Sequence, residues 1–208
     1  AHIIGDIQMI LRRLNARLDP VNHDEWLAHI DRMKDMYPLR YDKDVLSGPY
    51  VIEKLYEVTD GDAVISTDVG QHQMWTAQHF PFLHPRQLIT SGGLGTMGFG
   101  LGAAMGAAAS DPQGKPVALI TGDGSFRMNL TELSTIGYYN IPVIVVIFNN
   151  GTLGMVRQWQ TLFFGHRYSQ TTLDRGPDFM KLAEAYGLSG TRVDTVEAFA
   201  AAFKTAVE

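Results

Sequence analysis

The stretch Val117-Ala-Leu-Ile-Thr-Gly-Asp-Gly124, followed by Ile141-Pro-Val-Ile-Val-Val-Ile-Phe-Asn-Asn150, decides the fold of this chain. Both runs are apolar and rich in β-branched residues, which is typical of strands buried on both faces of a parallel sheet. The residues between them predict one helix, at 129–139, so the two runs form a strand–helix–strand unit. Asp123 and Asn150 then lie at the carboxyl ends of strands, the edge at which open α/β sheets bind ligands.

The same alternation extends on both sides of this unit. We predict strands at 63–67, 87–90, 117–121, 141–148 and 191–193. We predict helices at 47–58, 71–80, 97–110, 129–139, 153–162 and 177–186, and a last helix from 196. The fold class is therefore α/β, a doubly wound, mostly parallel sheet with helices on both faces.

The composition describes an ordinary globular protein of 208 residues, with 45% hydrophobic and 19% charged residues. A net charge of −5 argues against nucleic acid as a partner. The sequence contains no apolar run of membrane-spanning length and does not open with a signal-peptide pattern, so we expect no membrane role and a cytoplasmic location in a bacterium, or a plastid or mitochondrion in a eukaryote. The lack of cysteine excludes disulfides and thiolate chemistry.

A carboxylate and an amide oxygen at one sheet edge indicate a particular kind of metal site. Both are hard donors, which suit Mg²⁺ or Ca²⁺ better than zinc. Mg²⁺ held by few protein groups completes its coordination shell with phosphate oxygens and water. Asp123 and Asn150 therefore predict a metal-bound diphosphate, although an Asp that caps the following helix is the plainer interpretation of Asp123 alone.

Four motifs, in order along the chain, resemble those of one enzyme family. Gly122-Asp-Gly124 is separated by 24 residues from Asn149-Asn150, which is the spacing of the thiamine-diphosphate signature. With Gln71-His-Gln-Met-Trp75, Ser91-Gly-Gly-Leu-Gly-Thr-Met-Gly-Phe-Gly100 and Gly154-Met-Val-Arg-Gln-Trp-Gln160, the chain resembles the catalytic subunit of acetohydroxyacid synthase (anabolic acetolactate synthase) from about residue 48 to 187.

The resemblance implies a role for each matching residue. The metal ligands are Asp123, the side chain of Asn150 and the main-chain carbonyl of Thr152. Gln71, His72, Gly124 and Ser125 face the diphosphate, Gly95 and Met97 face the aminopyrimidine ring, and Met128 props the cofactor in its bent shape. Met155 and Trp159 shape the pocket of the second substrate. Plainer interpretations remain open: a core methionine for Met128, and an aromatic that anchors a helix on the sheet for Trp159.

The resemblance also implies an organisation and an activity. Residues 1–20 match the tail of a preceding central domain and 21–46 a linker. Residues 47–208 match a thiamine diphosphate/Mg²⁺-binding domain that is incomplete at its carboxyl end. The whole enzyme decarboxylates pyruvate and joins the hydroxyethyl unit to a second 2-keto acid, giving 2-acetolactate from pyruvate or 2-aceto-2-hydroxybutyrate from 2-ketobutyrate, in branched-chain amino acid biosynthesis.

Some parts of that enzyme are expected outside this chain. The glutamate that activates the cofactor belongs to a separate domain of a partner subunit, so we assign no catalytic residue here and expect the chain alone to be inactive. FAD is expected mostly on the central domain. The resemblance further implies a homodimer or homotetramer, with a regulatory small subunit as a possible partner.

Three other functions stay open at this point. The first is another thiamine-diphosphate decarboxylase, carboligase or oxidase. The second is a nucleotide-linked oxidoreductase, because Gly93-Leu-Gly-Thr-Met-Gly98 matches G-x-G-x-x-G after a strand. The expected acidic residue about 20 positions later is lacking, which argues against it. The third is a non-catalytic binding or assembly module.

Overall fold

The computed structural model describes residues 2–110 and 114–208 and divides the chain into two units, Ala1–Arg40 and Tyr41–Glu208. The first unit contains the helices α1 (Ile7–Asn15) and α2 (Asp24–Met36), neither of which has a buried residue. The domain limits expected at residues 20 and 46 stay a prediction. No helix in the described part of the chain is long and apolar enough to cross a bilayer.

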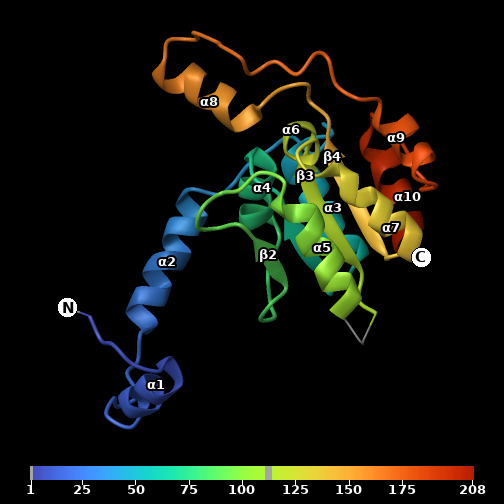
Figure 1. Cartoon of the computed structure of the whole chain (residues 1–208). Helices are drawn as coiled ribbons and strands as arrows, with labels where there is room; N and C mark the ends of the chain where they lie inside the picture. The colour runs from blue at the N-terminus through green and yellow to red at the C-terminus, as the bar shows by residue number, and fades with distance from the viewer. Residues whose placement is uncertain (1, 111–113) are drawn as a thin grey trace. The chain divides into compact units, whose positions relative to one another are not determined.

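The second unit is built on a four-stranded parallel sheet with the strand order β2-β1-β3-β4 (Figure 1). The central strand β3 is buried from Val117 to Thr121, as the apolar run predicts. Its two neighbours pair with it in parallel along their whole length. The strands are β1 (Val64–Thr67), β2 (Leu88–Thr90), β3 (Val117–Gly122) and β4 (Val143–Phe148).

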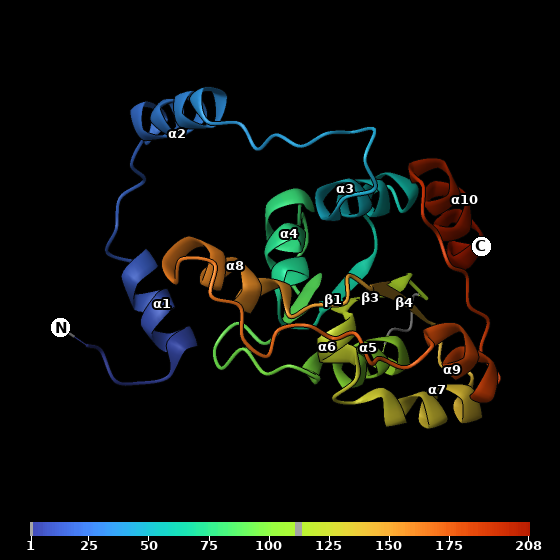
Figure 2. The same ribbon diagram turned by 90° about the horizontal axis from the view of Figure 1, so that it is seen from above.

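Helices cover both faces of the sheet (Figure 2). On one face, apolar side chains such as Ile52 and Phe199 pack against Ile65 and Ile120 of the strands. On the other, Leu101 and Ile136 pack against Leu119. The first face carries α3 (Gly48–Val58), α4 (Gln71–His79) and α10 (Val196–Val207), and the second carries α5 (Phe99–Ser110), α7 (Leu133–Tyr139) and α9 (Phe179–Ala185). The predicted doubly wound α/β class is confirmed.

The strand order explains where a ligand can enter. The chain leaves β1 toward β2 on one side and leaves β3 toward β4 on the other. Right-handed crossovers then place α4 and α7 on opposite faces, and the loops after β1 and β3 diverge. This divergence is the switch point at which doubly wound sheets bind ligands. Asp68 directly follows β1, and Asp123 directly follows β3.

Three predicted elements need correction. The helix expected at 129–139 is interrupted, because the chain already turns in α6 (Asp123–Phe126) and in a short 3-10 helix (Leu130–Glu132) before α7 begins. The helix expected at 97–110 begins at Phe99, since Gly98 has a φ of +92°, outside the helical region. The strand expected at 191–193 is wrong, because Val193 packs against the core without joining a ladder.

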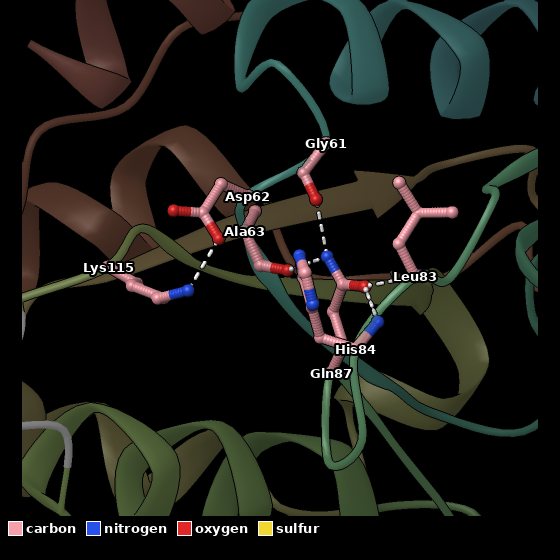
Figure 3. A network of polar contacts seen from close by, with 7 residues as sticks. All are labelled: Gly61, Asp62, Ala63, Leu83, His84, Gln87 and Lys115. Carbon is pink, nitrogen blue, oxygen red and sulfur yellow. Dashed lines mark hydrogen bonds and ion pairs between the residues drawn. The ribbon is translucent and has the colours of Figure 1, made fainter.

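The amino ends of β1 and β2 are held by the buried side chain of Gln87 (Figure 3). Its Nε2 donates to the carbonyls of Gly61 and Ala63, and its Oε1 accepts from the amides of Leu83 (3.0 Å) and His84 (3.4 Å). The side-chain amide therefore uses its two donor hydrogens and its acceptor oxygen. At this edge of the sheet, the hydrogen bonds of Gln87 hold backbone segments together. The opposite edge carries the residues predicted to bind a ligand.

Candidate functional site

The carboxylate of Asp123 joins the ends of β3 and β4. It is 1% exposed, and its Oδ1 accepts from the amide of Gly124 at 3.0 Å while its Oδ2 accepts from the amide of Gly151 at 2.8 Å. Burial raises the pKa of Asp123, and the two amides and the charge of Arg127 oppose that rise. The structure thus brings the Gly122-Asp-Gly124 and Asn149-Asn150 motifs together at one edge.

The loop that follows β4 exposes Asn150 beside this carboxylate. Oδ1 of Asn150 accepts from the amide of Thr152 at 3.0 Å, which forms a tight local turn. Thr152 bridges to Thr172, and its hydroxyl donates to the carbonyl of Thr171 at 2.8 Å. The Asn150 oxygen accepts no second hydrogen bond among the described residues, and Asn150 is exposed, so one lone pair is left for a cation.

Helix α4 contributes Gln71 and His72. Nε2 of Gln71 donates to Oε1 of Gln158 at 2.8 Å, which links α4 to α8 (Gly154–Phe163). The ring of His72 is 5% exposed and packs so closely on the backbone that a Cβ added at Gly122 would lie 3.1 Å from its Nδ1. Burial lowers the pKa of His72 to about 4, so the ring is neutral near pH 7. Its Nε2 is buried without a hydrogen-bond partner among the described residues.

The glycine-rich turn between β2 and α5 lies beside the Gly122-Asp-Gly124 motif. A Cβ added at Gly124 would lie 3.7 Å from the methyl carbon of Met97 and 2.6 Å from Cδ2 of Leu153, so a larger residue there would displace the Leu153 side chain. Gly95 has a φ of +63°, a backbone conformation that side chains disfavour. The hydroxyl of Ser125 donates to the carbonyl of Val69 at 2.8 Å, which ties the end of β1 to this group.

Met128 and Trp159 are both well exposed. Met128 is 60% exposed and lies against Gly98, where an added Cβ would be 3.0 Å from its own, so it is not a core methionine. Trp159 is 56% exposed and contacts Phe163 at a ring distance of 5.2 Å, so it does not anchor α8 on the sheet. The plainer interpretations of both residues are therefore disfavoured.

Helix α8 and the segment after it form a groove of about 650 Å³. Both residues predicted to shape a substrate pocket line it. Arg167 also lines the groove, and its Nε donates to the carbonyl of Phe164 at 3.0 Å. The lining residues are Met155, Val156, Trp159, Gln160, Phe164 and Arg167.

One acidic residue of the site was missed by sequence reasoning. Asp68 is 1% exposed, and its Oδ1 accepts from the amides of Val69 (3.0 Å) and Gly98 (2.7 Å). Its signal was a carboxylate at the end of a predicted strand, the signal that identified Asp123. It lies outside the four motifs, and therefore attracted no interpretation.

The donors at this edge fit a metal-bound diphosphate. Among the described residues, no group of three or more His, Asp or Glu side chains could hold a metal, so a self-sufficient zinc-type site is not formed. One buried carboxylate and one exposed amide oxygen leave most of an octahedral shell to ligand oxygens, as Mg²⁺ prefers. The unpartnered Nε2 of neutral His72 is a donor or acceptor that a ligand can satisfy.

Comparison with known proteins defines the class. The chain belongs to the family described as thiamine pyrophosphate enzyme, C-terminal TPP binding domain, which matches residues 68–208. This membership disfavours the nucleotide-linked oxidoreductase.

The relatives narrow the resemblance further. The chain is 46% identical over 205 residues to acetolactate synthase isozyme 2 large subunit of Escherichia coli (strain K12), covering 95% of this chain and 37% of that protein. It is 43% identical over 210 residues to acetolactate synthase large subunit of Lactococcus lactis subsp. lactis (strain IL1403), covering 99% and 36%. The resemblance expected from the motifs is confirmed, and the chain spans just over a third of these relatives.

Solved structures show the same fold. The chain superposes with a TM-score of 0.71 on Rhodococcus jostii RHA1 thiamine diphosphate-dependent 4-hydroxybenzoylformate decarboxylase, at 30% identity, covering 82% of this chain and 33% of that one. Benzoylformate decarboxylase from Polynucleobacter necessarius gives 0.72 at 25% identity, covering 81% and 32%.

Proposed function

We propose that this chain is the diphosphate- and metal-binding part of an acetolactate synthase. The whole enzyme would convert two molecules of pyruvate into 2-acetolactate and CO₂, or pyruvate and 2-ketobutyrate into 2-aceto-2-hydroxybutyrate and CO₂. The observation that carries the proposal is the contact of Asp123 with Gly151, which joins the two halves of the thiamine-diphosphate signature. The acetolactate synthase relatives support the carboligase over a simple decarboxylase.

The residues of the chain divide the work of holding the cofactor. Asp123, Asn150 and the carbonyl of Thr152 would hold Mg²⁺, and Gln71, His72, Gly124 and Ser125 would face the diphosphate. Gly95, Met97 and Met128 would form one wall for the aminopyrimidine ring. Bound thiamine diphosphate supplies the stabilisation of negative charge that decarboxylation of a 2-keto acid requires.

The buried setting has a chemical consequence. Neutral His72 adds no charge that would compete with the metal, and its unpartnered Nε2 is left for a hydrogen bond with the ligand. Buried Asp123 stays ionised most readily when a cation lies beside it, because an opposite charge offsets the cost of burial. Metal and diphosphate are therefore expected to bind together.

The remaining components of the enzyme are also part of the proposal. Met155 and Trp159 would shape the site of the second 2-keto acid, in the groove along α8. FAD and the activating glutamate would lie on parts of the enzyme outside this chain, and a regulatory small subunit and a homodimer or homotetramer would complete it. The cytoplasmic location expected from the sequence stays a prediction.

Calorimetric titration with thiamine diphosphate, with and without Mg²⁺, tests the proposal. We expect binding that depends on Mg²⁺ and is lost in Asp123→Ala. The same titration on the whole enzyme separates a wrong metal assignment from a site that needs its partner domain. Tight binding without Mg²⁺, or unchanged binding in Asp123→Ala, would refute the assigned metal site. A response to NAD but not to thiamine diphosphate would support the oxidoreductase instead.

A further inference from the structure

The carboxylate of Asp68 links the end of β1 to the glycine-rich turn. It accepts from the amide of Gly98 at 2.7 Å, across 30 positions of sequence, and from the amide of Val69 at 3.0 Å. The amide of Gly100, in the first turn of α5, also favours its charged form. Asp68 therefore caps α5 from a neighbouring strand, where the free amides and the helix dipole favour a negative group.

A buried carboxylate at this position costs desolvation free energy. Asp68 is 1% exposed and forms no ion pair within the described residues, so burial raises its pKa. Hydrogen bonds from backbone amides, and a smaller contribution from the hydroxyl of Ser125, favour the charged form and offset part of this cost. An apolar residue would fill the same space without that desolvation cost.

The amide of Gly98 belongs to the part of the glycine-rich turn that is predicted to face the aminopyrimidine ring. Gly98 has a φ of +92° and follows Met97 directly, and Gly95 has a φ of +63°. Glycine adopts positive and negative φ about equally readily, so the backbone of the turn does not fix its own conformation, and an external contact is needed to select one. The contact of Asp68 with Gly98 supplies it.

Val69, the residue after Asp68, connects the end of β1 to the Gly122-Asp-Gly124 motif. The carbonyl of Val69 accepts from the hydroxyl of Ser125 at 2.8 Å. In addition, the hydroxyl of Ser66 in β1 donates to the carbonyl of Gly100 at 2.9 Å. The end of β1 is thus the point to which both predicted ligand-binding loops are fastened.

We propose that Asp68 is a positioning residue, which fixes the backbone of the glycine-rich turn so that Gly95 and Met97 face the aminopyrimidine ring. This inference rests on the proposed function, because it assigns a purpose to the turn only if thiamine diphosphate binds there. Asp68 itself would not touch the cofactor. It would act through the amide of Gly98.

The test compares thiamine diphosphate dissociation constants in the whole enzyme with saturating Mg²⁺. Asp68→Ala removes the acceptor, and we expect the dissociation constant to rise by about tenfold, the equivalent of one hydrogen bond to a charged group. Asp68→Asn keeps an oxygen for the amide of Gly98, and we expect it to recover most of the affinity, to within about threefold of the wild type.

Gln87→Ala is the matched control. Gln87 is also buried and also holds backbone groups, but at the opposite edge of the same sheet. We expect it to lower the melting temperature as Asp68→Ala does, and to leave the dissociation constant within about twofold of the wild type. A merely structural role of Asp68 predicts equal effects on binding in the two variants.

The outcomes are distinguishable. If the wild type itself fails to bind thiamine diphosphate, the proposed function fails. If the wild type binds and Asp68→Ala binds as tightly, or Gln87→Ala weakens binding equally, the positioning role is refuted. If Asp68→Ala does not fold, Asp68→Asn decides: an affinity within about threefold of the wild type supports the role, and a loss of tenfold or more overturns it.

Discussion

The amide of Gly151 donates to the carboxylate of Asp123 over 2.8 Å, although the two residues are 28 positions apart and follow different strands. The contact fixes the loop that carries Asn150 to the loop that carries the acidic residue. A metal bound here would therefore meet its protein ligands in a preformed arrangement, which lowers the entropic cost of binding.

Asn150 and Thr152 are expected to respond differently to substitution. Asn150→Ala removes a side-chain oxygen from the proposed metal site, so we expect Mg²⁺-dependent binding of thiamine diphosphate to weaken by about tenfold or more. Thr152→Val keeps the backbone carbonyl and loses only the hydroxyl bond to Thr171, so its effect on binding should stay within about threefold. Calorimetry measures both, and equal losses would contradict the use of the Thr152 backbone.

Gly154, the first residue of α8, lies against the Gln71 side chain of α4. A Cβ at this position would lie 2.1 Å from Oε1 of Gln71, so Gly154→Ala must displace that side chain and break its bond to Gln158. We expect a loss of about 1–3 kcal/mol of unfolding free energy and weaker binding of the diphosphate. Gly102→Ala on α5 is the control, because an added Cβ meets nothing within 4 Å. It should be neutral or slightly stabilising, and a comparable loss there would argue against the steric explanation.

His72 makes stability depend on pH in a defined window. Its pKa falls from 6.5 to about 4 on folding because of burial, so the unfolded chain binds the extra proton between these values. Its contribution is present above pH 6.5 and is lost as the pH falls toward 4, by about 3 kcal/mol in total. The raised pKa values of Asp68 and Asp123 act in the opposite sense.

The difference between wild type and His72→Asn isolates that contribution. Denaturant unfolding of both proteins at pH 4.5, 5.5, 6.5 and 7.5, in the absence of ligand, gives the slopes. The wild type should lose stability more steeply than the variant on acidification below pH 6.5. Parallel slopes would mean that His72 is hydrated rather than buried in solution.

Gln87 is expected to matter for stability alone. Gln87→Ala leaves the backbone amides and carbonyls that its side chain binds without a hydrogen-bond partner. We therefore expect a loss of about 2–4 kcal/mol of unfolding free energy. Asp62→Asn, which removes the exposed ion pair with Lys115 shown in Figure 3, should cost less than about 1 kcal/mol. Chemical denaturation ranks the two, and the reverse order would contradict the described network.

Trp159 is expected to influence which 2-keto acid is accepted. Trp159→Leu replaces the largest apolar side chain that lines the groove by a smaller one, so we expect the preference for 2-ketobutyrate over pyruvate to fall by about tenfold in the whole enzyme. Leu162→Ala is the control, since Leu162 is 63% exposed on the same helix but does not line the groove. A competition assay with both acceptors measures the product ratio, and an unchanged ratio in Trp159→Leu would remove this residue from the acceptor site.

The strands and the pairing of the two main motifs were predictable because they follow from local pattern. The β-branched run before Asn149 needs burial on both faces, and Asp123 is placed by the strand before it. The burial of His72 was not predictable, because α4 has no clear apolar face and the closeness of Gly122 depends on tertiary packing. The strand expected at Val193 failed for a related reason: a short apolar run forms a strand only where a neighbour offers hydrogen bonds.

The role of Asp68 was hidden from the sequence for a further reason. The amides of Gly98 and Gly100, which favour the charged carboxylate of Asp68, lie about 30 positions further along the chain. No pattern in the sequence around Asp68 predicts this contact. The exposure of Trp159 was also not predictable from the helix pattern, because an aromatic residue on an amphipathic helix usually packs toward the core. Its exposure depends on the path of the chain around α8.

Two backbone hydrogen bonds join the two ends of the segment that contains α8. The amide of Leu153 donates to the carbonyl of Thr171 at 2.8 Å, and the amide of Leu173 donates to the carbonyl of Gly151 at 2.7 Å, so the segment that contains α8 leaves and returns at one place. Gly154 and Gln158 still contact Gln71 of the proposed diphosphate site, but changes in the rest of this segment, residues 159–170, are expected to leave the loop that carries Asn150 in place. Under the proposed function, acceptor choice could change during evolution, or be exchanged by loop grafting, without altering the proposed metal site.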